Sequence, residues 1–123
     1  MTGAKLWILL IVSLVLNAGA NLSLKAGMKS MPINGSILQL STILILLQHP
    51  LILLGLALFT VSFVGYSLVL SGMSLSLAYP IMTGGGFVIV VLASLILFAE
   101  EASLLRILGI MFIIAGIWIA SRY

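Results

Sequence analysis

The stretch Leu51–Leu70, LILLGLALFTVSFVGYSLVL, has twenty residues and no charged side chain. An α-helix needs about 20 predominantly apolar residues to cross the hydrocarbon core of a bilayer. We therefore predict that this stretch is a transmembrane helix. The dipeptide His49-Pro50 precedes it and favours a helix start there, because proline disfavours helical backbone at the residue before it and fits a first helical turn.

On either side of this stretch, we predict three further spans at about residues 6–24, 74–98 and 104–120. Ser103 precedes the last span and is expected to cap it. Lys5 and Ala18-Gly19-Ala20 also resemble the charged region and cleavage site of a signal peptide. We interpret this first segment instead as a retained helix.

The segment between the first two spans has a different character. It opens with a predicted polar turn that contains Lys25, Gly27, Lys29, Pro32, Asn34 and Gly35. Apolar residues then recur at helical spacing over residues 33–47, with polar residues off that stripe. Because this length is too short to span a bilayer, we predict an interfacial or re-entrant helix.

The composition of the whole chain excludes several classes of protein. Of the 123 residues, 63% are hydrophobic and 6% are charged, whereas soluble domains have about 25% charged residues. A soluble globular domain is therefore excluded. A nucleic-acid partner is excluded too, because five scattered Lys and Arg form no basic patch. The chain has no cysteine, so disulfides and cysteine-bound metals are absent.

These observations predict an all-α membrane protein with a single domain over residues 1–123. Each protomer would have four transmembrane helices and a short interfacial helix. We expect a dimer, because so small a bundle cannot enclose a large cavity alone. The flanking charges are nearly balanced, with Lys5 and Arg122 on one side and Lys25, Lys29 and Arg106 on the other. One fixed orientation and insertion in both orientations are both compatible with this balance.

The first span carries a polar stripe, because Ser13, Asn17, Asn21 and Lys25 recur every four residues. Two amides and an ammonium group facing lipid would be costly, so the stripe should face protein or a wet cavity. One interpretation is interhelical hydrogen bonding, with Lys25 extended toward the lipid head groups. The other is a polar groove with a cation at its mouth, which suits an anionic head group.

The third span has a second polar face, formed by Ser76, Tyr79, Thr83 and Gly86. Pro80 removes one backbone donor and permits a bend. The run Gly84-Gly85-Gly86 allows another backbone to approach closely or the helix to flex. A phosphate-binding loop is not favoured, because no Gly-Lys-Ser/Thr sequence follows the glycines.

The second and fourth spans carry patterns typical of helix packing. In the second span, Phe59, Phe63, Tyr66 and Leu70 form an aromatic stripe that is expected to pack against other helices. Tyr66 is singled out within it, because a buried hydroxyl needs a partner. In the fourth span, Gly109 and Gly116 lie seven residues apart on one face and favour an oligomer interface.

Acidic residues are absent from all four predicted spans, and Glu100 and Glu101 lie in the loop before the last one. Proton-coupled transport commonly uses an intramembrane carboxylate. His49 is expected at an interface, not in a proton relay. No catalytic triad, paired intramembrane carboxylates or metal-binding cluster can be assembled, so we predict no enzyme activity, no catalytic residues, no metal and no cofactor.

Two motifs resemble the small multidrug resistance proteins and the wider drug/metabolite transporter (EamA-like) superfamily. Leu16–Lys25, LNAGANLSLK, is similar to the family's first helix, which ends in a lysine. Ala78–Gly86, AYPIMTGGG, is similar to the family signature A-Y-A-I-W-[ST]-G-x-G. The glycine pair of the fourth span matches the family's seven-residue spacing. This resemblance implies a four-helix protomer that works as a dimer, with Tyr79 lining the pathway and Gly84 and Gly86 supporting packing and bending.

Three departures point to one branch of the superfamily. Asn17 stands where the multidrug members carry an essential glutamate, Met82 replaces the signature tryptophan, and residues 33–47 are additional. These departures resemble the flippase subunits for undecaprenyl-phosphate-linked aminoarabinose. That resemblance implies a polyprenyl-phosphate-linked sugar or similar amphipathic substrate, the bacterial inner membrane, and a homodimer or a heterodimer with a related four-helix subunit.

The expected function is therefore a transporter or flippase for an anionic lipid-linked substrate. Two alternatives are a proton-coupled exporter of small cations or drugs, with Glu100 or Glu101 as proton site, and a non-transporting accessory membrane subunit. The substrate-binding residues expected are Asn17, Asn21, Lys25, Tyr66, Tyr79 and Thr83. The helix-packing and dimerisation residues expected are Gly84, Gly86, Gly109 and Gly116.

Overall fold

The computed structural model describes residues 3–30 and 40–122. Helices account for most of this part of the chain: α1 (Gly3–Ser30), α2 (Leu40–Gln48), α3 (Pro50–Leu70), α4 (Leu75–Leu97) and α5 (Leu104–Arg122). All of them except α2 are long and apolar enough to cross a membrane. The prediction of an all-α membrane protein with four spanning helices and one shorter helix is confirmed.

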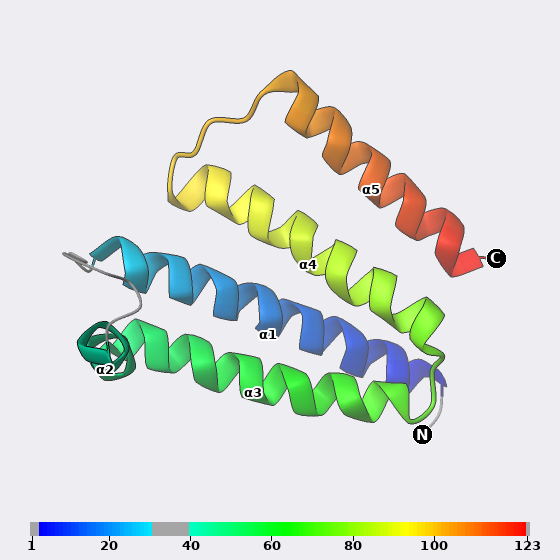
Figure 1. Cartoon of the computed structure of the whole chain (residues 1–123). Coiled ribbons are helices and arrows are strands. Elements are labelled where there is room, and N and C mark those ends of the chain that lie inside the picture. The colour runs from blue at the N-terminus through cyan, green and yellow to red at the C-terminus, as the bar shows by residue number, and fades with distance from the viewer. Residues whose placement is uncertain (1–2, 31–39, 123) are drawn as a thin grey trace.

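The four long helices run along one another, with α1 between α3 and α4 (Figure 1). Helix α5 contacts α4 but no other described helix. Helix α1 begins and α5 ends at the same end of the molecule (Figure 1). The core lies where α1, α3 and α4 meet, and its buried residues are Leu10, Leu14, Val69, Ala78 and Met82.

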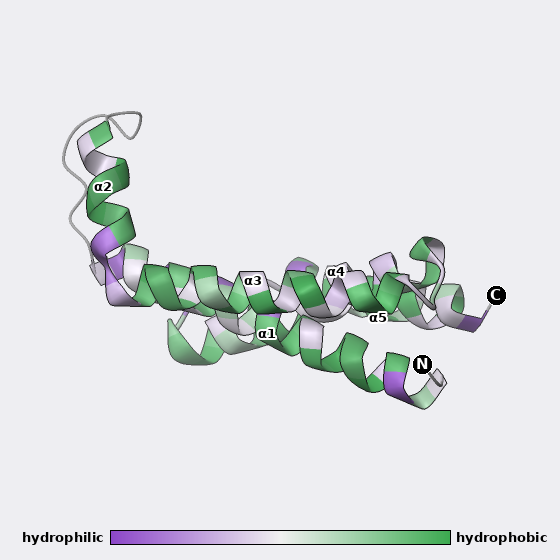
Figure 2. Ribbon diagram, turned by 90° about the horizontal axis from the view of Figure 1, so that it is seen from below, coloured by the Kyte–Doolittle hydropathy of each residue, from purple (hydrophilic) through white to green (hydrophobic). Residues whose placement is uncertain are grey.

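Helix α2 is directed away from the other four helices (Figure 2). The described part of the predicted 33–47 segment is helical from Leu40, and positions 33–39 lie outside the described residues. Most side chains of α2 are exposed apolar groups, while Thr42 is buried. A short apolar helix that leaves the bundle direction suits a position along the membrane surface.

The first helix is longer than the sequence pattern predicts. The predicted turn residues Lys25, Gly27 and Lys29 lie inside α1, which continues to Ser30. Gly27 is buried, and a Cβ there would come within 2.9 Å of the Ile52 side chain, so close packing against α3 offsets its low helix propensity. The two lysines suit the last turns of a helix, where cations interact favourably with the helix dipole.

Helices α1 and α3 approach closely because small residues line the contact. A Cβ at Gly55 would lie 3.1 Å from the Ala20 carbonyl oxygen and 3.0 Å from Leu24 Cγ. About two turns further along α3, Ser62 Oγ donates a 2.7 Å hydrogen bond to the Ser13 carbonyl oxygen. Close approach of this kind is how helices associate in a lipid environment, where apolar burial gives no driving force.

The expected packing role of the aromatic stripe on the second span is confirmed for Tyr66, which packs against the core, but not for Phe63. The face of α3 that packs on α1 contains the buried residues Ile52, Gly55, Ser62, Gly65 and Val69. Phe63 is instead 70% exposed and Leu70 is also exposed. Bulky rings would hold the two backbones apart, so the small residues occupy the contact and the aromatic residues lie beside it.

The predicted cap at Ser103 and the predicted helix start at His49-Pro50 both agree with the structure. Ser103 Oγ accepts a hydrogen bond from the Arg106 backbone N–H at 3.2 Å, which caps α5. His49 is the N-cap of α3 and Pro50 occupies its first turn. His49 Nδ1 accepts from the Leu51 N–H at 3.2 Å, and its Nε2 lies 3.0 Å from Ser30 Oγ at the end of α1.

Replacing His49 with alanine is expected to lower the free energy of unfolding by about 1 kcal/mol, because α3 loses its side-chain cap. His49→Asn should recover most of this loss, since the asparagine oxygen can also accept from Leu51 N–H. Unfolding in mixed micelles, followed by circular dichroism, measures both variants. Equal stability of His49→Ala and the unmodified protein would contradict a capping role.

Candidate substrate-binding cavity

A cavity of about 330 Å³ lies between α1, α3 and α4. Its lining combines hydrogen-bonding groups with aromatic rings and a thioether, from Asn17, Phe59, Ser62, Phe63, Tyr66, Tyr79 and Met82. No acidic or basic side chain is among these lining residues. The cavity therefore suits the uncharged polar part of an amphipathic molecule, with rings available for flat contact.

Two polar groups in this cavity have unused hydrogen-bonding capacity. The Tyr66 hydroxyl is buried and has no hydrogen-bond partner among the described residues. Asn17 accepts from Asn21 Nδ2 at its carbonyl oxygen, at 3.0 Å, and at Oδ1, at 3.2 Å. Within the described chain, no hydrogen bond uses the amide hydrogens of Asn17. A buried hydroxyl without a partner is costly, so Tyr66 favours a bound polar ligand or water here.

The polar stripe of the first span does not face a single neighbour. Ser13 is buried against α3, Asn17 lines the cavity, and Asn21 is exposed. A step of four residues turns a helix by about 40° more than one full turn. Over three such steps, the stripe winds away from α3. The expectation that the stripe faces protein or a wet cavity agrees with the positions of Ser13 and Asn17 but not with that of Asn21, which is exposed and donates two hydrogen bonds to Asn17.

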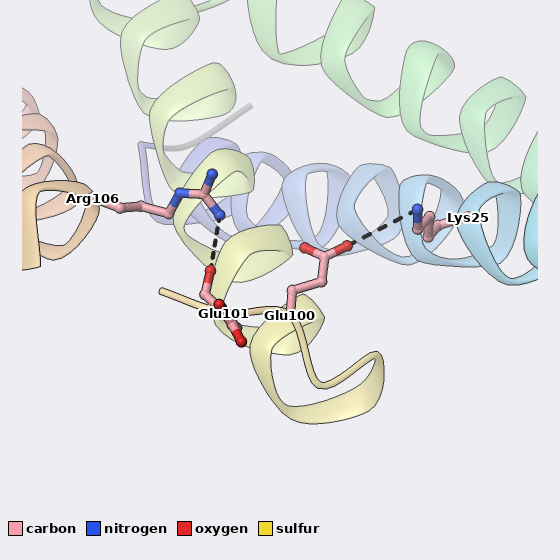
Figure 3. A network of polar contacts seen from close by, with 4 residues as sticks. All are labelled: Lys25, Glu100, Glu101 and Arg106. Atoms are coloured by element: carbon pink, nitrogen blue, oxygen red, sulfur yellow. Dashed lines mark hydrogen bonds and ion pairs between the residues drawn. The ribbon is translucent and has the colours of Figure 1, made fainter. Parts of the chain in front are cut away.

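Lys25 lies outside the cavity, at the end of α1 nearest the α4–α5 loop. Its Nζ is 4.0 Å from Glu100 Oε1, and the two side chains are 54% and 40% exposed. Figure 3 shows this ion pair beside the last turn of α4, with Arg106 donating to the Glu101 carbonyl oxygen at 3.4 Å. An exposed ion pair of this length contributes little to stability. Lys25 therefore remains available for an anion that replaces Glu100.

The two candidate residues of the third span, Tyr79 and Thr83, lie at different positions relative to the cavity. Tyr79 lines the cavity and is 57% exposed. Thr83 is exposed, lies outside the cavity lining, and donates from Oγ1 to the Tyr79 carbonyl oxygen at 2.8 Å. That bond lies within the helix and uses the threonine hydroxyl hydrogen. The structure thus brings together Asn17, Tyr66 and Tyr79, but not Asn21, Lys25 or Thr83.

The four candidate glycines have different surroundings. Gly84 of α4 lies against the Ile117 side chain of α5, and Gly86 faces Asn17 Oδ1 across the α1–α4 contact. Gly109 and Gly116 of α5 have no other atoms within 4 Å of a Cβ position. The first pair therefore supports packing within the protomer. The second pair lies on an open surface of the protomer.

Sequence reasoning missed part of the cavity wall. Ser62 and Met82 were not expected in the site, and Phe59 and Phe63 were expected to pack between helices. The small residues Gly55, Ser62 and Gly65 at helical spacing could have revealed the α3 face that contacts α1. Once that face is fixed, the aromatic residues of α3 must lie at its edge. Within residues 3–30 and 40–122, no three His, Asp or Glu gather as a metal site requires.

The comparison with protein families agrees with this architecture. The family model described as Small Multidrug Resistance protein matches residues 45–113, which include α3, α4 and the first half of α5. A search of curated proteins gives no match. Because the family match extends over more than half of the chain and the four long helices can cross a membrane, this multi-pass membrane protein belongs to the Small Multidrug Resistance family.

Proposed function

We propose that the protein is a dimeric transporter or flippase of the bacterial inner membrane for an amphipathic molecule with a phosphate-bearing head group. A polyprenyl-phosphate-linked sugar is the substrate class that fits best. The observation that carries this proposal is the cavity between α1, α3 and α4, whose lining offers amide, hydroxyl and aromatic groups without a carboxylate. Sugars are bound by such groups, and an anionic substrate meets no repulsive charge in the cavity.

The charges outside the cavity support the same substrate class. Lys25 is exposed near one end of α1, where a phosphate at the membrane surface can reach it. Asn21 lies one turn further along the helix from Lys25, and Asn17 lies one turn beyond Asn21. The path from Lys25 to the cavity is therefore about 12 Å long at 1.5 Å per residue. A phosphate would bind Lys25 while the sugar hydroxyls bind the amides.

Dimerisation and movement are the remaining parts of the proposal. Gly109 and Gly116 leave an open apolar surface on α5, which suits close contact with a second copy or a related subunit. Pro80 lies inside α4 and the glycines follow it, so α4 can bend next to Tyr79. Rocking of the helices around the cavity would expose it to either side of the membrane.

The proposal is tested by substituting Lys25 and measuring binding of dodecyl phosphate, a simple anionic amphiphile, in detergent solution. Lys25→Ala is expected to weaken binding roughly tenfold, because one charged hydrogen bond is lost. Lys29→Ala is the matched control. It removes the same charge one turn away, where Lys29 lies 5.5 Å from the Phe98 ring centre, and should change binding less than about twofold. Equal effects of the two substitutions would contradict a specific role for Lys25.

A second candidate function is favoured by the aromatic rings of the cavity. Phe59, Phe63, Tyr66 and Tyr79 surround one space, and aromatic faces attract cations. A proton-coupled exporter of small cations or drugs would use these rings. Proteoliposomes distinguish the candidates: gradient-driven uptake of dodecyltrimethylammonium supports the exporter, and translocation of a polyprenyl phosphate supports the flippase. Transport of neither, together with a stoichiometric complex with another membrane protein, supports an accessory subunit.

A further inference from the structure

A second pocket lies between α4 and α5, in the region next to the loop that joins them. The two helices are close where Ile117 lies against Gly84, and they separate toward the loop at residues 98–103 (Figure 1). Phe87, Val91 and Ser94 continue the α4 face that begins at Gly84, at spacings of three and four residues. The resulting pocket has a volume of about 330 Å³.

This pocket has apolar walls and two opposite charges at one end. Its lining residues are Phe87, Val90, Val91, Ser94, Leu95, Glu100 and Arg106. Five of the seven come from α4, while Glu100 comes from the loop and Arg106 from the first turn of α5. Figure 3 shows both charged side chains beside the last turn of α4. They therefore lie at the end of the spanning helices, at the depth of lipid head groups.

Both charged groups have unused binding capacity. Glu100 has a single ion pair among the described residues, at 4.0 Å from Lys25, through one of its two oxygens. Arg106 has five N–H donors on its guanidinium group, and one of them contacts the Glu101 carbonyl oxygen at 3.4 Å. Neither contact is short, so each group can bind a second partner without losing a strong interaction.

From this charge arrangement, we infer that the α4–α5 pocket binds one phospholipid with a zwitterionic head group that contains a primary ammonium. Arg106 binds the phosphate, because a guanidinium group matches phosphate oxygens in a bidentate geometry. Glu100 accepts hydrogen bonds from the ammonium. An acyl chain lies along Phe87, Val90 and Val91 between the two helices. The lipid holds α5 at a fixed distance from α4.

The charges favour this occupant over a second copy of the chain. An apolar helix face would leave Glu100 and Arg106 without new partners, whereas a zwitterionic head group provides one for each. The site is also separate from the cavity of the proposed function, which uses Tyr79 and Met82 on a different part of α4. The inference therefore does not depend on the identity of the transported substrate.

The test uses three phospholipids that share the same oleoyl chains and differ in the head group: ethanolamine, choline and glycerol. Native mass spectrometry of the purified full chain in detergent measures the amount of each lipid bound. Phosphatidylethanolamine is expected to bind roughly tenfold better than the choline and glycerol lipids. Arg106→Gln should lower its binding roughly tenfold, and Glu100→Gln should remove the preference for ethanolamine over choline.

Matched controls carry the same substitutions outside the pocket. The first control is Glu101→Gln, at the residue next to Glu100. The second is Arg122→Gln, at the opposite end of α5, where the Arg122 guanidinium lies 4.6 Å from the Trp118 ring centre. Both controls should retain the lipid preference. Arg106→Lys should retain part of the binding, which separates loss of charge from loss of fold. Equal binding of the three lipids would overturn the inference. It would also be overturned if Arg106→Gln lowered the fraction of dimer but left lipid binding unchanged.

Discussion

Asn17→Glu is expected to reverse the charge preference of the cavity between α1, α3 and α4. Asn17 lines this cavity together with the rings of Tyr66 and Tyr79, and no lining residue carries a charge. A phosphate bound at Lys25 lies about 12 Å from position 17, and a carboxylate at that distance opposes it by about 1.4 kcal/mol at an effective dielectric constant of about 20. Binding of an anionic amphiphile should therefore weaken roughly tenfold, while binding of a cationic amphiphile in the cavity strengthens.

Two probes with the same tail and opposite head groups measure this reversal. Dodecyl phosphate and dodecyltrimethylammonium differ in charge but share the apolar chain, so partitioning into detergent affects both similarly. Asn17→Gln is the matched control, because glutamine has the shape of glutamate without its charge. It should keep the preference of the unmodified protein. If Asn17→Glu and Asn17→Gln bind both probes alike, position 17 does not contact the ligand head group.

Gly55→Leu is expected to disrupt packing of α1 on α3, with a loss of about 3 kcal/mol in the free energy of unfolding. A Cβ at position 55 would meet Leu24 Cγ at 3.0 Å and the Ala20 carbonyl oxygen at 3.1 Å. The carbonyl belongs to the helix backbone and cannot rotate away. Leucine favours helix more than glycine does, so any destabilisation must come from the contact between the helices.

Gly116→Leu provides the comparison for this variant. It makes the same substitution in a spanning helix, at a position where a Cβ meets no atom within 4 Å. The protomer should therefore keep its stability, and the dimer proposed to form through α5 should dissociate. Thermal unfolding and size measurement in detergent report the two effects separately. Equal destabilisation of the protomer by both variants would show that the α1–α3 contact does not require glycine.

The number and kind of helices could be predicted because hydropathy is a local property of the chain. Leu51–Leu70 alone is long and apolar enough to cross a bilayer, and α3 spans Pro50–Leu70 in the structure. The cap residue Ser103 and the helix start at His49-Pro50 were also predictable, because capping and proline effects act on backbone groups within a few residues. The end of α1 was not predictable in this way. Its extension to Ser30 depends on the contact between Gly27 and Ile52 of another helix.

The residues of the candidate site also fall into those that local sequence predicts and those that depend on contacts between helices. Asn17, Tyr66 and Tyr79 could be selected from their polarity within apolar spans, and all three line the cavity. Their partners could not be selected, because the lining also depends on the rotation of α3 about its axis. The small residues at Gly55 and Ser62 set that rotation by packing on α1, which turns Phe59 and Phe63 toward the cavity edge.

Local hydropathy is sufficient to predict four membrane-spanning helices, because each span satisfies its own backbone hydrogen bonds and needs no other segment to do so. The sequence also shows that no acidic residue lies within the predicted spans. The packing of the helices places Lys25 beside Glu100, brings Asn17 alone of the polar stripe to the cavity, and forms a charged pocket between α4 and α5. Such features depend on how helices distant in the chain are rotated and placed against one another, which local patterns do not encode.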